Sequence, residues 1–165
     1  MLKLSIENIN RHSPYHIQLS GNGLFNFVTD EAQTYEVGFV EDHMITIENA
    51  YQLFLIPKSG PNEYKDNKIQ QTITAILEEF FCSNDVLLDY ICDTKDGRQA
   101  VRSRLFTHWF QMYPYRHRFT LRTISVELED VSYYASVIIR NSNPNYAECI
   151  EAIDAFEKEM KEKFG

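Results

Sequence analysis

The sequence is poor in cysteine, proline and glycine, and it contains no long apolar run. Three Cys, five Pro and six Gly among 165 residues exclude a disulfide-stapled miniprotein, a collagen-like chain and a low-complexity linker. The longest apolar runs, near 53–57 and 137–139, are far too short to span a bilayer. The first residues mix polar and apolar side chains, so no signal peptide is expected. These absences predict a reduced, cytoplasmic protein with no membrane partner.

Patterns of metal ligands and cofactor motifs are also missing. Pro14 separates His12 from His16, which argues against a helical zinc pair, and no C-x-x-C occurs. Asp93 and Asp96 lack the third carboxylate that a hard cation needs. Phosphate loops, dinucleotide fingerprints and serine-hydrolase elbows are absent. We expect no metal and no cofactor, and the balance is against an enzyme without deciding the matter.

Apolar and aromatic residues are plentiful, at 44% and 13% of the chain, which suffices to bury a core. The length fits a single domain over residues 1–165. Alternating and β-branched patterns predict short strands joined by turns, so the first third of the chain is expected to be an antiparallel meander. These strands are expected over 24–29, 35–40, 44–48 and 51–56.

Further along, apolar residues recur at helical spacing, and they predict three helices, a strand buried on both faces and a β-hairpin. In chain order these are a helix over 67–82, a strand over 86–92, a helix over 97–113, a hairpin over 119–129 and 132–140, and a helix over 146–164. The fold class predicted is α+β: a mostly antiparallel sheet, strands first, with about three helices packed mainly on one side.

Charge is distributed unevenly along the chain. The net charge is −8, yet residues 95–122 hold seven basic side chains against one acidic. Six of the eight arginines lie in this segment, and Arg forms forked contacts with carboxylate and phosphate that Lys cannot match. The segment therefore predicts recognition of an anionic partner. The alternative is that these arginines pair with acidic residues of the same fold.

Helical phase suggests a special position for two of these arginines. Counted along an ideal helix, Arg98 and Arg102 fall on the face that carries Val101 and Trp109, whereas Arg104 points to solvent. An arginine aligned with an apolar stripe must extend past it to water or meet a partner.

Just upstream, a strand runs through a short loop into this helix. Such a junction presents backbone N–H groups and a positive helix end to an anion. One interpretation is an anion site formed by Arg98 and Arg102, with Asp93, Asp96 or His108 as an orienting or proton-transfer group. The other is a structural network in which the aspartates hold the two arginines and no ligand binds.

Residues 109–119 interleave aromatic and basic side chains, as binders of single-stranded nucleic acid do. Helical phase explains Trp109 and Phe110 as core. The remaining surface candidates are Tyr113, Tyr115, Arg116, His117 and Arg118. Because the whole chain repels nucleic acid, a plain loop is the favoured interpretation and nucleic acid the less favoured partner.

The segment from Leu88 to Phe110 contains the pattern Y-x-C-D-x-x-D-G-R-x-x-x-R-x-R-L-F-x-x-W-F. With it the chain resembles a small family of bacterial proteins of unknown function, similar in length and in their strands-first layout. The resemblance implies a single domain and brings no activity, substrate or cofactor with it.

The sequence thus predicts a non-enzymatic binding module that recognises an anionic partner through residues 95–122. The expected contacts are Arg98, Arg102, Arg104, Arg116 and Arg118. The partner would be an anionic protein surface or a phosphate-containing ligand.

Two other functional interpretations stay open. One is a small enzyme acting on a phosphorylated or nucleotide-like substrate where strand 88–92 meets the helix beginning at 97. The other is a homodimer in which the basic segment of one subunit docks on the acidic remainder of its partner.

Overall fold

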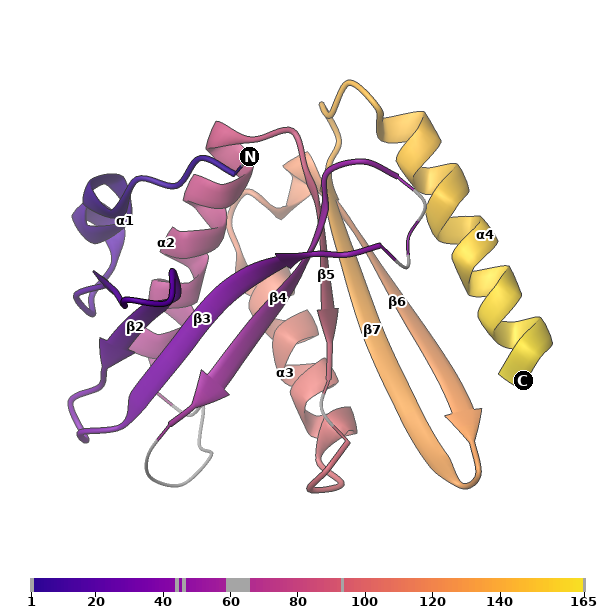
Figure 1. The fold of residues 1–165 in the computed structure, drawn as a ribbon, viewed down its shortest axis with the longest axis horizontal. Coiled ribbons are helices and arrows are strands. Elements are labelled where there is room, and N and C mark those ends of the chain that lie inside the picture. Colours follow the sequence, from indigo (N-terminus) through magenta and orange to yellow (C-terminus); the bar gives the residue numbers. More distant parts are fainter. Residues whose placement is uncertain (1, 44, 46, 59–65, 93, 165) are drawn as a thin grey trace. The chain divides into compact units, whose positions relative to one another are not determined.

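The computed structural model describes residues 2–43, 45, 47–58, 66–92 and 94–164. Seven strands are hydrogen-bonded in the order β1-β2-β3-β4-β5-β7-β6 (Figure 1). The pairs β1–β2, β2–β3, β5–β7 and β6–β7 are antiparallel. The elements are α1 (Ile6–His12), β1 (Gln18–Leu19), β2 (Phe25–Val28), β3 (Thr34–Glu41), β4 (Ala50–Pro57), α2 (Asn67–Ser83), β5 (Leu87–Ile91), α3 (Gln99–Met112), the 3₁₀ turn η1 (Arg116–Arg118), β6 (Phe119–Leu128), β7 (Val131–Arg140) and α4 (Tyr146–Phe164). The predicted mixture of helices and strands and the predicted mostly antiparallel sheet are confirmed.

The chain separates into two compact units. The first unit combines the residues before Val40 with Leu53–Asp85, and the second combines Val40–Gln52 with the chain from Val86 onward. Whether the two behave as one domain stays a prediction.

In the first unit, aromatic rings carry much of the packing. Phe27 of β2 lies opposite Tyr35 of β3 in register, and their rings stack at 5.4 Å between centroids. The ring of Tyr15 also stacks on Phe27, at 5.9 Å between centroids. Phe80 of α2 stacks on Phe39 of β3 at 4.3 Å. The predicted helix over 67–82 is confirmed, because its apolar residues do form one buried face against this sheet.

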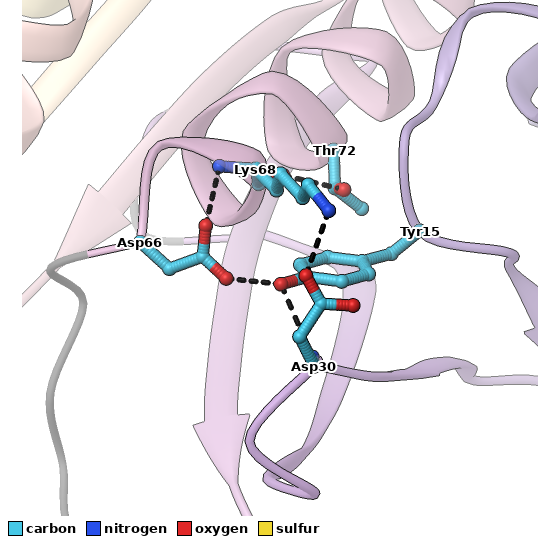
Figure 2. A network of polar contacts seen from close by, with 5 residues as sticks. All are labelled: Tyr15, Asp30, Asp66, Lys68 and Thr72. Carbon is cyan, nitrogen blue, oxygen red and sulfur yellow. Dashed lines mark hydrogen bonds and ion pairs between the residues drawn. The ribbon is translucent and has the colours of Figure 1, made fainter.

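A polar network fixes the point where α2 begins (Figure 2). One carboxylate oxygen of Asp66 accepts the backbone N–H of Lys68 at 2.7 Å, and the other accepts the hydroxyl of Tyr15. That hydroxyl also accepts the backbone N–H of Asp30 at 3.2 Å, while Lys68 Nζ pairs with the Asp30 carboxylate at 2.7 Å. Burial and the bond to Asp66 raise the pKa of Tyr15 to about 12. The hydroxyl is therefore a donor at any physiological pH.

The second unit is built around β5, which is covered on both faces. Tyr90 stacks on Phe106 of α3 at 4.6 Å between centroids. On the opposite face, Leu87 belongs to a buried cluster with Cys149 and Ile153 of α4. The expectation that the helices pack mainly on one side is wrong for this unit, because a strand that is apolar on both faces needs cover on each.

The order of elements also departs from the strands-first prediction, because α1 precedes the strands. Ser5 caps this helix by accepting the backbone N–H of Asn8 at 3.2 Å, and the helix ends before Pro14. Only Ile9 of its seven residues is buried, so the sequence shows no periodic apolar face there.

The strand expected over 44–48 is not found. Residues 44 and 46 lie outside the described residues, and Ile45, Ile47 and Glu48 are not in a strand. Instead, the N–H of Ile47 donates to the carbonyl of Ile45 at 2.8 Å. The β-branched residues here reflect burial of Ile45 in the cluster with α4 and not pairing in the sheet.

We predict that Tyr15→Phe lowers the free energy of unfolding by about 1–2 kcal/mol, because Asp66 loses a buried donor while the ring stack on Phe27 is kept. Urea unfolding followed by circular dichroism measures the change. Tyr133→Phe, at an exposed position of β7, is the matched control. Equal midpoints for the two variants would contradict the role assigned to the network.

Candidate functional site

At the start of α3, Asp96 and Arg102 form an ion pair within the fold. The carboxylate of Asp96 accepts hydrogen bonds from both terminal guanidinium nitrogens of Arg102. Nη1 lies 2.9 Å from Oδ1, and Nη2 donates to Oδ2. The Oδ1 atom also accepts the backbone N–H of Arg98 at 3.1 Å. The hydrogen bond from Arg102 holds the pKa of Asp96 below its ordinary value. Arg102 is thus engaged, its side chain only 14% exposed, and Asp93 lies outside the described residues.

The predicted apolar face of α3 is wrong by about a quarter of a turn. The buried residues of this helix are Gln99, Ser103 and Phe106, whereas Val101 and Met112 are 42% and 61% exposed. The stack of Phe106 on Tyr90 and the bond from Gln99 Nε2 to the carbonyl of Ser132, at 2.9 Å, select the face that meets the sheet. Arg98 is consequently exposed and is not aligned with the core.

Four arginines of the basic segment remain on the surface. They are Arg98, Arg104, Arg116 and Arg118, and none of them forms an ion pair with any acidic residue that the structure describes. We call these four the exposed arginines. His108 is likewise exposed on α3. The sixth arginine of the segment, Arg122, is used inside the second unit, where it pairs with Asp154 at 2.8 Å and Glu157 at 2.9 Å, both on α4.

The turn η1 presents two exposed arginines on a fixed backbone. Asn141, just after β7, donates its backbone N–H to the carbonyl of Arg118 at 2.8 Å and its side-chain amide to that of His117 at 3.0 Å. Its Oδ1 accepts the hydroxyl of Thr120 at 2.6 Å. The guanidinium of Arg118 lies 4.6 Å from the centre of the Tyr115 ring. In the sequence Asn141 is recognisable only as a turn residue, so these hydrogen bonds could not be predicted.

A second feature is an acidic hollow of about 480 Å³ in the second unit. Its lining consists of Glu41, Asp42, His43, Ile45, Ile47, Glu48, Asn49 and Ala50. The one basic group among them, His43, lies 3.8 Å from the Glu41 carboxylate. The hollow therefore combines three carboxylates with an aliphatic wall.

Beside this hollow, the carboxyl of Asp89 is buried in the middle of β5. The side chain is on the α4 face of the sheet, opposite Val137, and the residue is 2% exposed. Its polar neighbour is another carboxyl, that of Asp42, and no backbone N–H or other side-chain donor reaches either of its oxygens. Burial, followed by the hydrogen bond and the charge of Asp42, raises the pKa of Asp89 to about 9. At neutral pH Asp89 accordingly keeps its proton.

Sequence reasoning missed this pair, although one signal was available. Asp89 is the single charged residue in the run V-L-L-D-Y-I-C, which was predicted to be buried on both faces. A carboxyl in such a strand must lose its charge or gain a partner. The contact with Asp42, which lies far away in the sequence, has no signal of its own.

Other site chemistries find no support among the described residues. No group of three His, Cys, Asp or Glu there is placed to hold a metal ion, and no helix there is long and apolar enough to cross a membrane. All three cysteines are free thiols. Burial raises the pKa of the Cys92 thiol to about 11, which makes it a poor nucleophile.

Comparison with known families places the chain. Residues 65–158, more than half of the sequence, match DUF6169, a family of unknown function. The chain belongs to this family. The resemblance to an uncharacterised family is thereby confirmed, and DUF6169 membership assigns no activity. The DUF6169 match includes the exposed arginines and Asp89, whereas Asp42 precedes it. No curated protein matches the chain.

We predict that Asp89→Asn stabilises the protein by about 1–3 kcal/mol near pH 8, because an amide does not ionise and so removes the ionisation of Asp89 that favours the unfolded chain at this pH. The folded state holds the Asp89 proton up to about pH 9, whereas an unfolded Asp loses it near pH 4. Stability is therefore fully present below about pH 4 and falls as pH rises toward 9.

Denaturant unfolding between about pH 5 and pH 9 measures both effects. Asp89→Asn should show a smaller fall over this range than the wild type, and the exposed Glu151→Gln should follow the wild type. A wild-type stability that rises steadily from pH 5 to pH 9 would contradict a protonated Asp89.

Proposed function

We propose that this DUF6169 protein is a non-enzymatic binding module that recognises an acidic segment of a protein partner through the exposed arginines. One observation carries the proposal. The chain has 24 acidic residues and a net charge of −8, yet these four guanidinium groups form no ion pair with any acid in the described residues. Arginines left free in an excess of carboxylates are available to an external anion.

The distribution of these groups favours an extended acidic partner over a small phosphate ligand. Arg98 is the N-cap of α3, Arg104 lies along α3, and the other two arginines lie on η1, which contacts α3. Met112 and Tyr115, which are 61% and 47% exposed, lie between them in the chain. A surface that alternates Arg with exposed apolar side chains suits a peptide that carries both carboxylates and apolar residues. The negative charge of the whole protein disfavours nucleic acid.

We predict that Arg104→Ala/Arg116→Ala/Arg118→Ala weakens binding of a fluorescent Glu- and Leu-containing peptide at least about tenfold, because three charge-assisted contacts are lost. Fluorescence anisotropy at about 50 and 200 mM salt measures affinity, which should fall with salt for the wild type. Lys3→Ala/Arg11→Ala/Lys158→Ala removes the same charge from exposed positions elsewhere and should bind as the wild type does.

Equal weakening in both triple variants would reduce the effect to net charge and contradict a specific surface. Tighter binding of single-stranded RNA than of the acidic peptide would replace the proposal with a nucleic-acid function. Salt-sensitive self-association, seen by sedimentation without any peptide, would favour the homodimer in which the exposed arginines dock on acidic residues of a second copy.

The enzymatic alternative at the junction of β5 and α3 receives less support. It needs the guanidinium groups of Arg98 and Arg102 to converge on a phosphate, but Arg102 is held by Asp96 and Arg98 is exposed.

We also propose that residues 90–110 form the signature that DUF6169 proteins share, that the family is bacterial, and that this protein is cytoplasmic. The free thiols of its cysteines support a reducing compartment.

A further inference from the structure

We propose that the acidic segment of the partner binds as an added strand, antiparallel to β6, along the outer edge of the sheet. This inference rests on the proposed function, because Arg116 and Arg118 immediately precede β6 and would contact the acidic end of that segment.

The strand β6 forms a long and regular edge of the sheet. It is the last strand in the order (Figure 1), and it pairs with β7 through ten consecutive residues without a bulge. Proteins commonly protect sheet edges with short strands, proline or bulges, because an open edge pairs with other chains. The strand at the opposite end of the order, β1, has two residues, whereas β6 has ten and contains no proline. Such an edge is what strand addition requires.

The hydrogen-bond pattern shows which backbone groups of β6 point outward. The N–H of Asn141 donates to the carbonyl of Arg118 at 2.8 Å, and these two residues continue the register of β6 with β7. Hydrogen-bonded pairs alternate along an antiparallel ladder, so the backbone groups of the even-numbered residues of β6 point toward β7. The turn agrees, because Glu129 and Asp130 both have positive φ, as in a two-residue turn that closes on a hydrogen-bonded pair.

The odd-numbered residues of β6 therefore present their backbone N–H and C=O groups at the outer edge. Four of them have no backbone partner there among the residues that the structure describes, namely Leu121, Thr123, Ser125 and Glu127. The side chains of the last three are exposed. The helix α4 covers β6 from one face, where Ile124 is buried and Arg122 pairs with Asp154. A strand added at the edge would pair with these four residues.

The two ends of this edge carry opposite charge. Arg116 and Arg118 lie at the beginning of β6, on a turn whose carbonyls are held by Asn141. Three exposed carboxylates lie at the other end, those of Glu127, Glu129 and Asp130. Ten residues of strand separate the ends by about 30 Å, which is several Debye lengths at physiological salt. Each end therefore attracts its own counterpart on the ligand.

This charge order defines the partner segment. An antiparallel strand places its C-terminal end beside η1 and its N-terminal end beside the turn, and antiparallel pairs are slightly more stable per residue than parallel ones. The segment should therefore carry Glu or Asp at its C-terminal end and Lys at its N-terminal end. Apolar side chains at alternate positions would lie beside Val126, which is half-buried, and Leu128, which is 38% exposed.

Amide hydrogen exchange followed by NMR tests the added strand directly. The ligand is a ten-residue peptide with Lys at its N-terminal end, alternating Thr and Leu, and Glu at its C-terminal end. In the full chain, the amides of Thr123 and Ser125 should exchange at least about tenfold more slowly when the peptide is saturating. Those of Arg122 and Ile124, already bonded to β7, should not change. Unchanged exchange at Thr123 and Ser125 would overturn the proposal.

A matched pair of peptides separates strand addition from charge attraction. One is N-methylated at odd positions and the other at even positions, so their charges are equal. Only alternate residues of an added strand donate to β6, so one of the two should bind about tenfold or more weakly than the other in fluorescence anisotropy. Equal affinities would overturn the proposal.

The peptide with reversed sequence tests the orientation. It should bind the wild type about tenfold more weakly, because each of its charges meets a like charge. Glu127→Gln/Glu129→Gln should narrow this preference, and Glu7→Gln/Glu151→Gln, at exposed positions elsewhere, should keep it. Equal binding of both sequences by the wild type would contradict an antiparallel strand, and so would a preference that Glu127→Gln/Glu129→Gln leaves unchanged.

The proposed function and this inference fail differently. If Arg104→Ala/Arg116→Ala/Arg118→Ala binds the peptide as the wild type does, the arginine surface itself is wrong. If that variant binds weakly but the two methylated peptides bind equally, the arginines recognise the partner and the added strand is wrong. A dimer seen by sedimentation without peptide, with slow exchange at Thr123 and Ser125, would place a second copy at this edge and overturn the proposal.

Discussion

A carboxyl group at the centre of a strand that is covered on both faces is the constraint that organises the second unit. Tyr90 faces α3 and Leu87 faces the α4 cluster, so the side chain of Asp89, on the α4 face, is almost wholly buried. An isolated buried carboxylate costs several kcal/mol, and the protein avoids this by keeping the proton on Asp89. The hydrogen bond and the charge of Asp42 add to the effect of burial, and this contact joins the buried strand to a residue that lines the hollow.

The basic residues of the same unit are divided between two uses. Arg102 and Arg122 are satisfied by acids of the fold, one closing the start of α3 and the other joining β6 to α4. The exposed arginines have no such acid in the described residues, and two of them stand on a turn whose carbonyls are held by Asn141. A backbone that is fixed before binding loses less conformational entropy when a partner arrives, which favours recognition by these groups.

Long periodic segments could be predicted from the sequence, and short or context-dependent features could not. The helix 67–82, the strand 86–92, the hairpin and the last helix carry strong patterns, and the structure has them within a few residues. The helix α1 has one buried residue and therefore no pattern. The location of α3 could be predicted but not its buried face, because Val101 and Met112 are apolar yet exposed, and contacts with β5 and β7 decide its rotation.

Some features of the candidate sites could likewise be predicted from the sequence, and others could not. Counting charges is enough to locate the arginine segment, since it depends on composition alone. Which arginines are free depends on acids brought near by folding, such as Asp154 and Glu157. The pairing of Asp42 with Asp89 also arises only in three dimensions. A buried polar group that weakens a fold is often retained because a function needs it, and this pair, which destabilises the folded state at neutral pH, fits that trade-off.

The central claim is that Asp89 keeps its proton at neutral pH, and a carboxyl-carbon NMR titration of this residue tests it most directly. The account predicts a midpoint near pH 9 for Asp89. It also predicts a lower midpoint in Asp42→Asn, since the neighbouring negative charge is removed. A midpoint near 4, the value of an ordinary Asp, would show that the buried carboxyl is ionised and would contradict the account.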